Sequence, residues 1–405
     1  MTQIVKIGNI STQIRGVSYS KSDAVSNMQE GYLPVLRANN IQEQGLILED
    51  FVYVPESKIS KKQRILAGDV IIAASSGSIS LVGKAASAKE DINAGFGAFC
   101  KILRPNTELV DPRYFANYFQ TQQYRQIISN LAAGANINNL KNEHLDDLEI
   151  PLPPLSEQRR IASILDQADV LRQKRQQAIE KLDQLLQATF IDMFGDPVSN
   201  PKGWEVKKLS ELSTKIHSGN TPKGGSENYV DQGIIFLRSQ NVWKNKVILD
   251  DVAYIDAETH SKMMKSSVKH EDLLMTKTGR INTENSSLGR AAIYLGEDDS
   301  ANINGHVYLI RIKDGFNKYF ILRILTLHDY YEYIRSVCVG GIDKRQLNKE
   351  HIENFPIIQP PMELQNKFSN IVQVIESQKP KLLEQLDLAE NLFKTLLQKA
   401  FNGTL

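Results

Sequence analysis

Two stretches of the chain read almost alike: LKNEHLDDLEIPLPPLSEQ at residues 140–158 and LNKEHIENFPIIQPPMELQ at residues 347–365. In each, a polar segment with a Glu-His pair leads into two prolines, and a long stretch with helical spacing follows. Proline lacks a backbone N–H and fixes φ, so paired prolines end a strand and suit the start of a helix. The chain therefore repeats a boundary between two kinds of structure.

The repetition extends along the whole chain of 405 residues. VLRANNI at 35–41 matches FLRSQNV at 236–242, and LLQATF at 185–190 matches LLQKAF at 396–401. The matches keep their order, and their offset rises slowly, as expected of two copies that differ by short loop insertions. Solenoid repeats have periods of about 20 to 50 residues. A single duplication of a much longer unit instead predicts two similar domains.

Each copy has two unlike parts. Short apolar runs such as DVIIAA at 69–74 and GIIFL at 233–237, separated by Gly, Asn and Ser, predict strands between turns. Residues 155–194 then lack Gly and Pro and place apolar residues at spacings of three and four. Such a helix would be about 60 Å long at 1.5 Å per residue, and a narrow stripe of that length is typical of a coiled-coil seam.

The second copy ends in a similar apolar stripe, but Pro380 lies within it. Because proline removes a backbone hydrogen bond, it is expected to kink or split this helix, and the continuity of the helix stays open. The fold class predicted is α+β, with two similar mixed domains joined by two long helices that pair as a coiled coil. The predicted domains are residues 1–154 and 196–361, and the predicted helices are residues 155–195 and 362–405.

The composition limits the possible functions. Lys and Arg (48) balance Asp and Glu (47), and the formal net charge of +1 gives no global field for a polyanion, so such a site must be local. Cys100 and Cys338 have no CxxC neighbour, which argues against a zinc ribbon or a disulfide framework and favours a reducing compartment. The sequence has no signal-like start and no apolar run of membrane length. We therefore expect a cytoplasmic protein that does not contact a membrane.

No catalytic motif is evident. The nearest approach to a phosphate-binding loop, GSISLVGKA at 77–85, has the wrong spacing between its glycines, and Ala85 stands where Ser or Thr should bind magnesium. A turn between strands is favoured there. His144 and His351 are equivalent in the repeat, and helix capping or packing is favoured over acid-base chemistry. The sequence predicts no catalytic residue, no metal site and no cofactor in this chain.

One region carries a resemblance to a known family. The stretch from PLPPLSEQ at 151–158 to FGDPVSNPKGW at 194–204 resembles the central conserved region of the specificity subunits of type I restriction-modification systems. The duplicated layout is similar to that family from end to end. The resemblance implies that each domain is a target recognition domain reading one part of a split DNA sequence. It also implies that the two helices pair antiparallel as a spacer and hold methyltransferase subunits.

The resemblance further implies a subunit without catalysis of its own. Its partners would be double-stranded DNA, two methyltransferase (modification) subunits and, through them, motor-nuclease (restriction) subunits. Adenine methylation and ATP-dependent cleavage would belong to those partners, and so would S-adenosylmethionine, ATP and Mg. The half-site sequences, their spacing, the methylated base and the existence of a restriction subunit stay open.

Three pairs of equivalent loops carry side chains that suit DNA. Arg and Lys read guanine and Asn and Gln read adenine in the major groove, while Lys, Arg, Ser and Thr bind phosphates. We predict that the loops cluster on one face of each domain, although solvated turns are the alternative. The loop pairs are 37–40 with 238–241, 75–78 with 277–280, and 134–139 with 341–346.

The duplication sorts the candidates within these loops. If the domains read different half-sites, residues identical in both copies hold the fold or grip phosphate, and only differing residues discriminate bases. The candidates for framework or phosphate contact are Arg37, Asn40, Arg238 and Asn241. The candidates for base edges are Asn39, Gln240, Ser76, Lys277, Arg280, Asn136, Asn138, Lys344 and Arg345. The set of DNA-binding candidates also includes Ser78, Thr278 and the equivalent pair Lys84 and Arg290.

A different class of function remains open beside DNA reading. An antiparallel helix pair with two similar end modules also suits a coiled-coil adaptor that binds proteins, with Arg172, Lys174 and Arg175 as a charged docking surface. The near-zero net charge agrees with DNA reading only if partner subunits supply much of the phosphate neutralisation that non-specific affinity requires.

Overall fold

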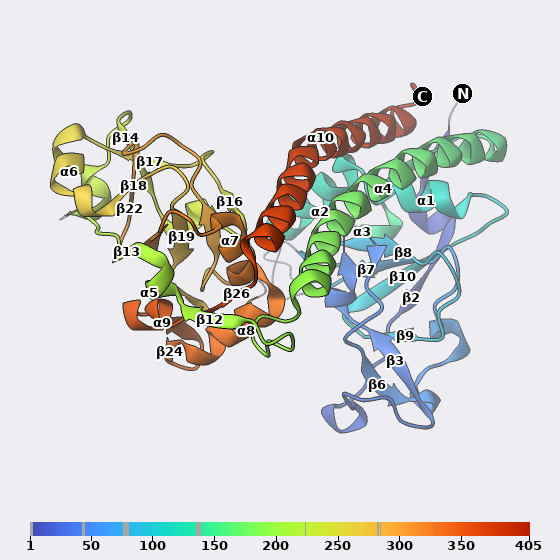
Figure 1. The fold of residues 1–405 in the computed structure, drawn as a ribbon. Coiled ribbons are helices and arrows are strands. Elements are labelled where there is room, and N and C mark those ends of the chain that lie inside the picture. Colours follow the sequence, from blue (N-terminus) through green and yellow to red (C-terminus); the bar gives the residue numbers. More distant parts are fainter. Residues whose placement is uncertain are drawn as a thin grey trace. The chain divides into compact units, whose positions relative to one another are not determined.

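The chain forms two compact units, and both long helices contribute to both units (Figure 1). The first unit comprises Met1–Gln177 with Leu382–Leu405, and the second comprises Ala178–Lys381. The computed structural model contains no helix with the length and apolarity of a membrane span in the residues it describes. Those residues are 3–42, 45–75, 81–134, 139–222, 224–281, 283 and 285–405.

The long helices follow the prolines as predicted. Helix α4 is Leu155–Phe194 and helix α10 is Met362–Phe401, and each has 40 residues. Helix α10 continues through Pro380, so the second helix is not split. Lys379 beside this proline donates to Asp183 of α4 and to Glu376 one turn earlier, both at 2.7 Å. These contacts help to hold the helix where one backbone hydrogen bond is missing.

In the first unit, the start of α4 runs antiparallel to the end of α10. Arg160 Nη2 donates to the carbonyl of Leu405 at 2.9 Å, and further along α4 the Arg172 guanidinium lies 5.0 Å from the centre of the Phe393 ring. Along these contacts the residue numbers rise on α4 and fall on α10, as in an antiparallel pair. The predicted antiparallel pairing is confirmed here.

The second unit pairs the other two helix segments in the same sense. Asp183 meets Lys379, and the ring centres of Phe194 and Phe368 are 5.6 Å apart. Phe190 and Phe194 also pack on Phe320 of the domain, with ring centres 5.6 and 4.9 Å apart. Each domain is thus covered by two helix segments, one from each long helix.

The first domain is built on small sheets with helices between them. A four-stranded antiparallel sheet has the order β2 (Ser11–Arg15), β10 (Cys100–Pro105), β7 (Val70–Ala73) and β8 (Ala85–Ser87). A second sheet has the order β6 (Val52–Pro55), β3 (Tyr32–Leu36) and β9 (Gly95–Phe96). The remaining elements are the pair β1 (Gln3–Lys6) and β11 (Glu149–Leu152), the pair β4 (Ile41–Gln42) and β5 (Gly45–Leu46), and helices α1 (Pro112–Tyr118), α2 (Gln122–Gly134) and α3 (Asn142–Asp146).

The second domain repeats this plan, as the internal duplication predicts. Its four-stranded antiparallel sheet has the order β13 (Ser213–Ser218), β23 (Val307–Ile312), β19 (Leu273–Thr276) and β21 (Ala291–Ile293). A second sheet has the order β17 (Ala253–Ile255), β14 (Ile234–Leu237), β22 (Ala301–Ile303) and β18 (Ser267–Val268). Strands β20 (Thr278–Arg280), β25 (Lys344–Gln346) and β24 (Val339–Gly340) form a third sheet in that order. The other strands and α-helices of this domain are β12 (Glu205–Lys208), β26 (Pro356–Gln359), β15 (Val242–Trp243), β16 (Lys246–Val247), α5 (Leu209–Leu212), α6 (Ala257–Lys262), α7 (Lys318–Thr326), α8 (His328–Val337) and α9 (Lys349–Glu353).

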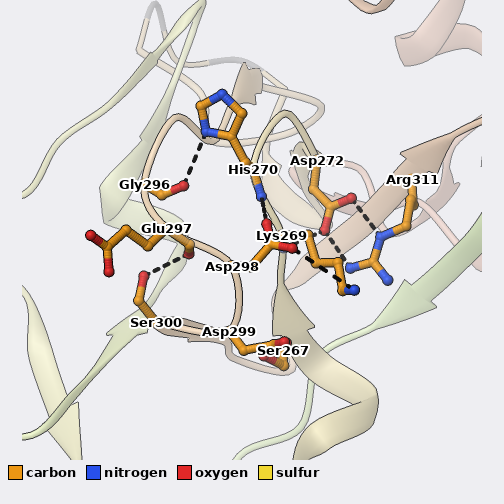
Figure 2. A network of polar contacts seen from close by, with 10 residues as sticks. All are labelled: Ser267, Lys269, His270, Asp272, Gly296, Glu297, Asp298, Asp299, Ser300 and Arg311. Carbon is orange, nitrogen blue, oxygen red and sulfur yellow. Dashed lines mark hydrogen bonds and ion pairs between the residues drawn. The ribbon is translucent and has the colours of Figure 1, made fainter. Parts of the chain in front are cut away.

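A buried ion pair ties the central sheet of the second domain to the turn before β19 (Figure 2). Arg311 donates from Nε and Nη2 to the carboxylate of Asp272 at 2.8 and 2.7 Å, and the backbone N–H of Lys269 donates to it at 2.7 Å. The hydrogen bond with Asp272 raises the pKa of Arg311 above its usual value. The first domain has the equivalent pair of Asp69 and Arg104, at 2.8 and 2.7 Å. The duplication has kept this bidentate bridge in both copies.

Candidate nucleic-acid interface

The three candidate loops of the second domain lie side by side, joined by the turn 304–306. The N–H of Asn304 donates to the carbonyl of Leu237 at 2.9 Å, next to the first loop. The N–H of Lys277 donates to the carbonyl of His306 at 2.8 Å, and the N–H of Leu347 donates to the carbonyl of Lys277 at 2.8 Å. A continuous set of backbone bonds therefore gathers loops that are far apart in the sequence.

The first domain repeats these bonds around the turn 97–99. The N–H of Gly97 donates to the carbonyl of Leu36 at 2.8 Å, and the N–H of Ser75 donates to that of Phe99 at 3.0 Å. Ser75 also forms a bridge with Asn139 of the third loop. Ser76, Ser78, Asn136 and Asn138 lie outside the described residues.

In the second domain, the second and third loops form one small sheet. Strand β20 (Thr278–Arg280) pairs with β25 (Lys344–Gln346), which pairs with β24 (Val339–Gly340). Arg280 lies opposite Lys344 across the sheet, and both side chains are exposed. Asp343 meets Arg280 at 3.4 Å. Like charges directly opposite each other are unfavourable unless they are compensated, and Asp343 compensates part of the repulsion here.

The side chains of the second domain's first loop bond mainly within the loop. Asn241 is 1% exposed; it accepts from the N–H of Arg238 at 2.9 Å and donates to the carbonyls of Ile248 and Asp251 at 3.1 and 2.8 Å. Arg238 donates to the Asp251 carbonyl at 3.1 Å, and Gln240 donates to the Asp251 carboxylate at 2.9 Å. The hydrogen bonds of the Asn241 side chain therefore hold the loop in a compact conformation.

The first loop of the first domain is held by the same kind of hydrogen bonds. Asn40 is 1% exposed and donates to two backbone carbonyls, while Arg37 and Asn39 donate to the carboxylate of Asp50, each at 3.2 Å. Asn40 and Asn241 are therefore framework residues, and their burial removes them from the set of DNA contacts. Arg37 and Arg238 are tied to an aspartate at the rim of the loop.

Arg290 is also an internal residue. It is 7% exposed, its guanidinium donates to the carbonyls of Ser286 and Asn285, and it lies 3.8 Å from the centre of the Trp243 ring. Burial lowers the pKa of Arg290. The expectation that it contacts DNA is corrected, because its hydrogen-bonding groups face the protein.

Lys84, the equivalent of Arg290, has the same backbone bonds but a different side-chain environment. Its carbonyl accepts from the N–H of Ala73 at 2.9 Å, as that of Arg290 accepts from Thr276 at 2.9 Å. Its side chain lines a cavity of about 220 Å³ together with Arg172 and Phe393. The contact of Lys84 with DNA stays a prediction.

The remaining candidates of the second domain differ in their surroundings. The Lys277 ammonium lies 5.7 Å from the centre of the Tyr308 ring, and Arg345 donates to the carbonyl of Arg335 at 3.4 Å. Thr278 is half-buried opposite Gln346. Arg280 and Lys344 are the most exposed of these loop candidates.

His217 on β13 lies among charges of both signs. Burial lowers the pKa of His217, and the nearby ammonium groups of Lys215, Lys265 and Lys349 lower it further. Burial also lowers the pKa of Lys215, while the carboxylates of Asp272 and Asp299 act in the opposite direction.

Two exposed apolar residues beside these loops were not among the candidates predicted from the sequence. Phe99, in the joining turn of the first domain, is 69% exposed, and Ile342, between β24 and β25, is 89% exposed. The joining turn carries His306 in place of Phe99 in the second domain, judged by the shared backbone bonds. The sequence signal available for this site was a turn whose residues differ between the two copies and that precedes a buried strand.

The repeated histidines serve the helix starts, as expected. The N–H of Lys141 donates to Nδ1 of His144, and the N–H of Asn348 donates to Nδ1 of His351, both at 3.3 Å. In the described ranges no three His, Cys, Asp or Glu side chains form a group that could hold a metal ion.

Comparison with known proteins gives one consistent family. The family model of the type I restriction modification DNA specificity domain matches residues 2–181 and 201–387. The StySPI specificity subunit of Salmonella potsdam and the EcoKI specificity subunit of Escherichia coli, both type I restriction enzyme subunits, are each 29% identical to this chain. The alignments cover 98% and 99% of this chain and 88% and 89% of those proteins.

The fold agrees with a solved structure. The crystal structure of a type I restriction-modification system S subunit from M. genitalium covers 99% of this chain and 96% of its own, with 17% sequence identity and a TM-score of 0.54. Both repeated domains, with the start of the helix that follows each, fall within the matched family ranges. The chain belongs to the family of type I restriction modification DNA specificity domains and carries two copies of that domain.

Proposed function

We propose that this chain is the DNA specificity subunit of a type I restriction-modification complex, in which each domain reads one half of a bipartite target. One observation carries the proposal: the same backbone bonds join the described parts of the three loops in both domains, and the first loops share the framework residues Asn40 and Asn241 but differ at the exposed residues Asn39 and Gln240. A scaffold repeated with altered side chains is what two readers of different sequences require. The names of the relatives support the same role.

In this proposal the chemistry belongs to partner subunits. Two methyltransferase subunits supply S-adenosylmethionine and methylate adenine, and motor-nuclease subunits supply ATP- and Mg-dependent cleavage. This chain orients them on DNA and performs no reaction. Partners also supply much of the phosphate neutralisation, because the chain itself has a net charge of +1. The complex works in the cytoplasm, where Cys100 and Cys338, both buried and free, stay reduced.

The function is tested by mapping methylated bases in DNA from cells that express this chain with its methyltransferase. We expect methylation at a single sequence made of two fixed halves and an unspecified spacer of constant length. Scrambling either half should abolish methylation at that site. Methylation without a bipartite pattern would contradict the proposal and favour the adaptor alternative. Tight, weakly selective binding of duplexes by the isolated chain at physiological salt would contradict the expectation that partners supply much of the phosphate neutralisation.

The exposed aliphatic side chains of the helices support a docking role for the methyltransferase. Leu388 and Leu392 are 61% and 46% exposed, and they lie four residues apart on one face of α10. Val170 and Leu171 on α4 are 48% and 39% exposed in the same unit. Aliphatic groups along paired helices that stay in water are typical of a surface that a partner covers.

The double substitution Leu388→Glu and Leu392→Glu is expected to reduce co-purification of the methyltransferase at least about 10-fold, because two buried charges would replace two apolar contacts. The fold should survive, since both side chains face water in the free chain. Leu48→Glu, at a 43% exposed residue of the first domain outside the helices, is the matched control. If the methyltransferase co-purified equally well with both variants, the docking surface would not include this face of α10.

A further inference from the structure

The hairpin of β24 and β25 ends in an isolated apolar side chain. Ile342 is 89% exposed, more than any other large apolar side chain in the described part of the chain. It stands between Gly341 and Asp343, where the chain turns from one strand to the next. The side chain of Ile342 is therefore free to contact a partner at the tip of the hairpin.

The hairpin holds this tip rigidly. Gly340 has φ +139°, and a Cβ there would lie 2.6 Å from the carbonyl oxygen of Lys344, so only glycine fits. The N–H of Gly341 donates to the same carbonyl at 3.1 Å. The N–H of Ile281 donates to the carbonyl of Asp343 at 2.9 Å, which ties the tip to the end of β20.

Gly341 shows that the tip is kept thin. A Cβ at this residue would meet no atom within 4 Å, and its φ lies outside the left-handed region. Neither packing nor backbone conformation therefore requires glycine at position 341. A side chain beside Ile342 would widen the tip, so Gly341 leaves the tip narrow.

The charges around the tip identify the partner. Arg280 and Lys344 face each other just behind Ile342 and are both exposed, and the carboxylate of Asp343 meets Arg280 at 3.4 Å. An apolar tip flanked by cations matches a nucleic acid, in which phosphates line a groove and stacked bases form its floor. Proteins that kink DNA insert Ile, Leu, Phe or Met between base pairs in this way, while Arg and Lys hold the backbone.

We propose that Ile342 is a wedge that partly unstacks one base step of the half-site read by the second domain. This inference rests on the proposed DNA-reading function. It adds a readout of deformability, because flexible steps such as TA and CA unstack at lower cost than others. Specificity at that step then needs no hydrogen bond to a base.

The test uses the full chain with its methyltransferase and duplexes that carry 2-aminopurine at each position of the second half-site in turn. The wild-type complex should raise 2-aminopurine fluorescence several-fold at one step other than the methylated adenine. Ile342→Ser should abolish that rise and weaken binding to the cognate duplex about 10- to 100-fold, with binding to scrambled duplex and the salt dependence unchanged. Gly341→Val should have the same effect by widening the tip.

Met264→Ser is the control, since Met264 is 47% exposed in the same unit but outside the three loops, and it should change neither signal. Selective binding without a fluorescence rise at any step overturns the wedge alone. So does an effect of Ile342→Ser that disappears when uracil replaces thymine, because it would indicate a thymine-methyl contact in the major groove. Loss of the methyltransferase from Ile342→Ser would show a protein contact and also overturn it. A wild-type complex that does not select the cognate duplex overturns the proposed function, and the wedge with it.

Discussion

Asp272→Ala is expected to destabilise the second unit by about 3–5 kcal/mol, because it leaves the Arg311 guanidinium without its partner in a largely buried site. The Asp272 side chain is 1% exposed and that of Arg311 is 25% exposed. The substitution also removes the acceptor for the N–H of Lys269. The measurement is urea denaturation followed by tryptophan fluorescence. Both tryptophans of the chain, Trp204 and Trp243, lie in the second unit, so the signal reports that unit alone.

Asp298→Ala is the matched control in the same network (Figure 2). Asp298 is 56% exposed; it accepts from the N–H of His270 at 2.8 Å and meets the ammonium of Lys269 at 3.9 Å. An exposed pair of this kind contributes at most about 1 kcal/mol. Equal shifts in the denaturation midpoints of the two variants would contradict the special role of the buried bridge.

The double substitution Arg280→Ala and Lys344→Ala is expected to weaken binding to the cognate duplex about 30- to 1000-fold, which corresponds to about 2–4 kcal/mol. The two side chains lie opposite each other on β20 and β25, and both point into solvent in the free chain. Removal of two phosphate or guanine contacts should also lower the slope of log affinity against log salt by about 1 to 2. Titrations of the complex with its methyltransferase at several salt concentrations measure both quantities.

A control for charge alone is Lys262→Ala with Lys246→Ala. Both lysines are exposed in the second unit and lie outside the three loops. Their removal changes the net charge by the same amount, and we expect less than about a threefold loss of affinity, because screening weakens distant charges. If the two double variants lost affinity equally, the second recognition surface would lie elsewhere.

The fold could be predicted from the sequence where the signals are local. The proline pairs and the apolar stripes place the ends of α4 to within one residue and those of α10 to within four, because capping and periodicity depend on neighbouring residues. Pro380 is the exception. From its neighbours alone, Pro380 was expected to kink or split the helix. Helix α10 nevertheless continues through it, with Lys379 held by Asp183 and Glu376.

The candidate face could be predicted only in part, because its geometry depends on contacts between distant residues. Comparison of the two copies separated Asn241 from Gln240 correctly as a framework candidate, since identical residues in both copies share a structural role. The sequence did not predict the burial of Arg290, which depends on the distant ring of Trp243 and the carbonyl of Ser286. The joining turn with Phe99 was missed because only backbone bonds across the sheet bring it to the face.

The division of the two long helices between the units has a consequence for how the protein folds during its synthesis on the ribosome. The second unit is one continuous segment, Ala178–Lys381, while the first unit needs Leu382–Leu405 as well. The ring of Phe401 stacks on Tyr114 with centres 5.0 Å apart, and Leu397 is buried in the same core. The domain that is synthesised first is therefore completed last, against the usual vectorial order. Translation that stops at residue 381 would spare the second domain and leave the first with its aromatic core uncovered.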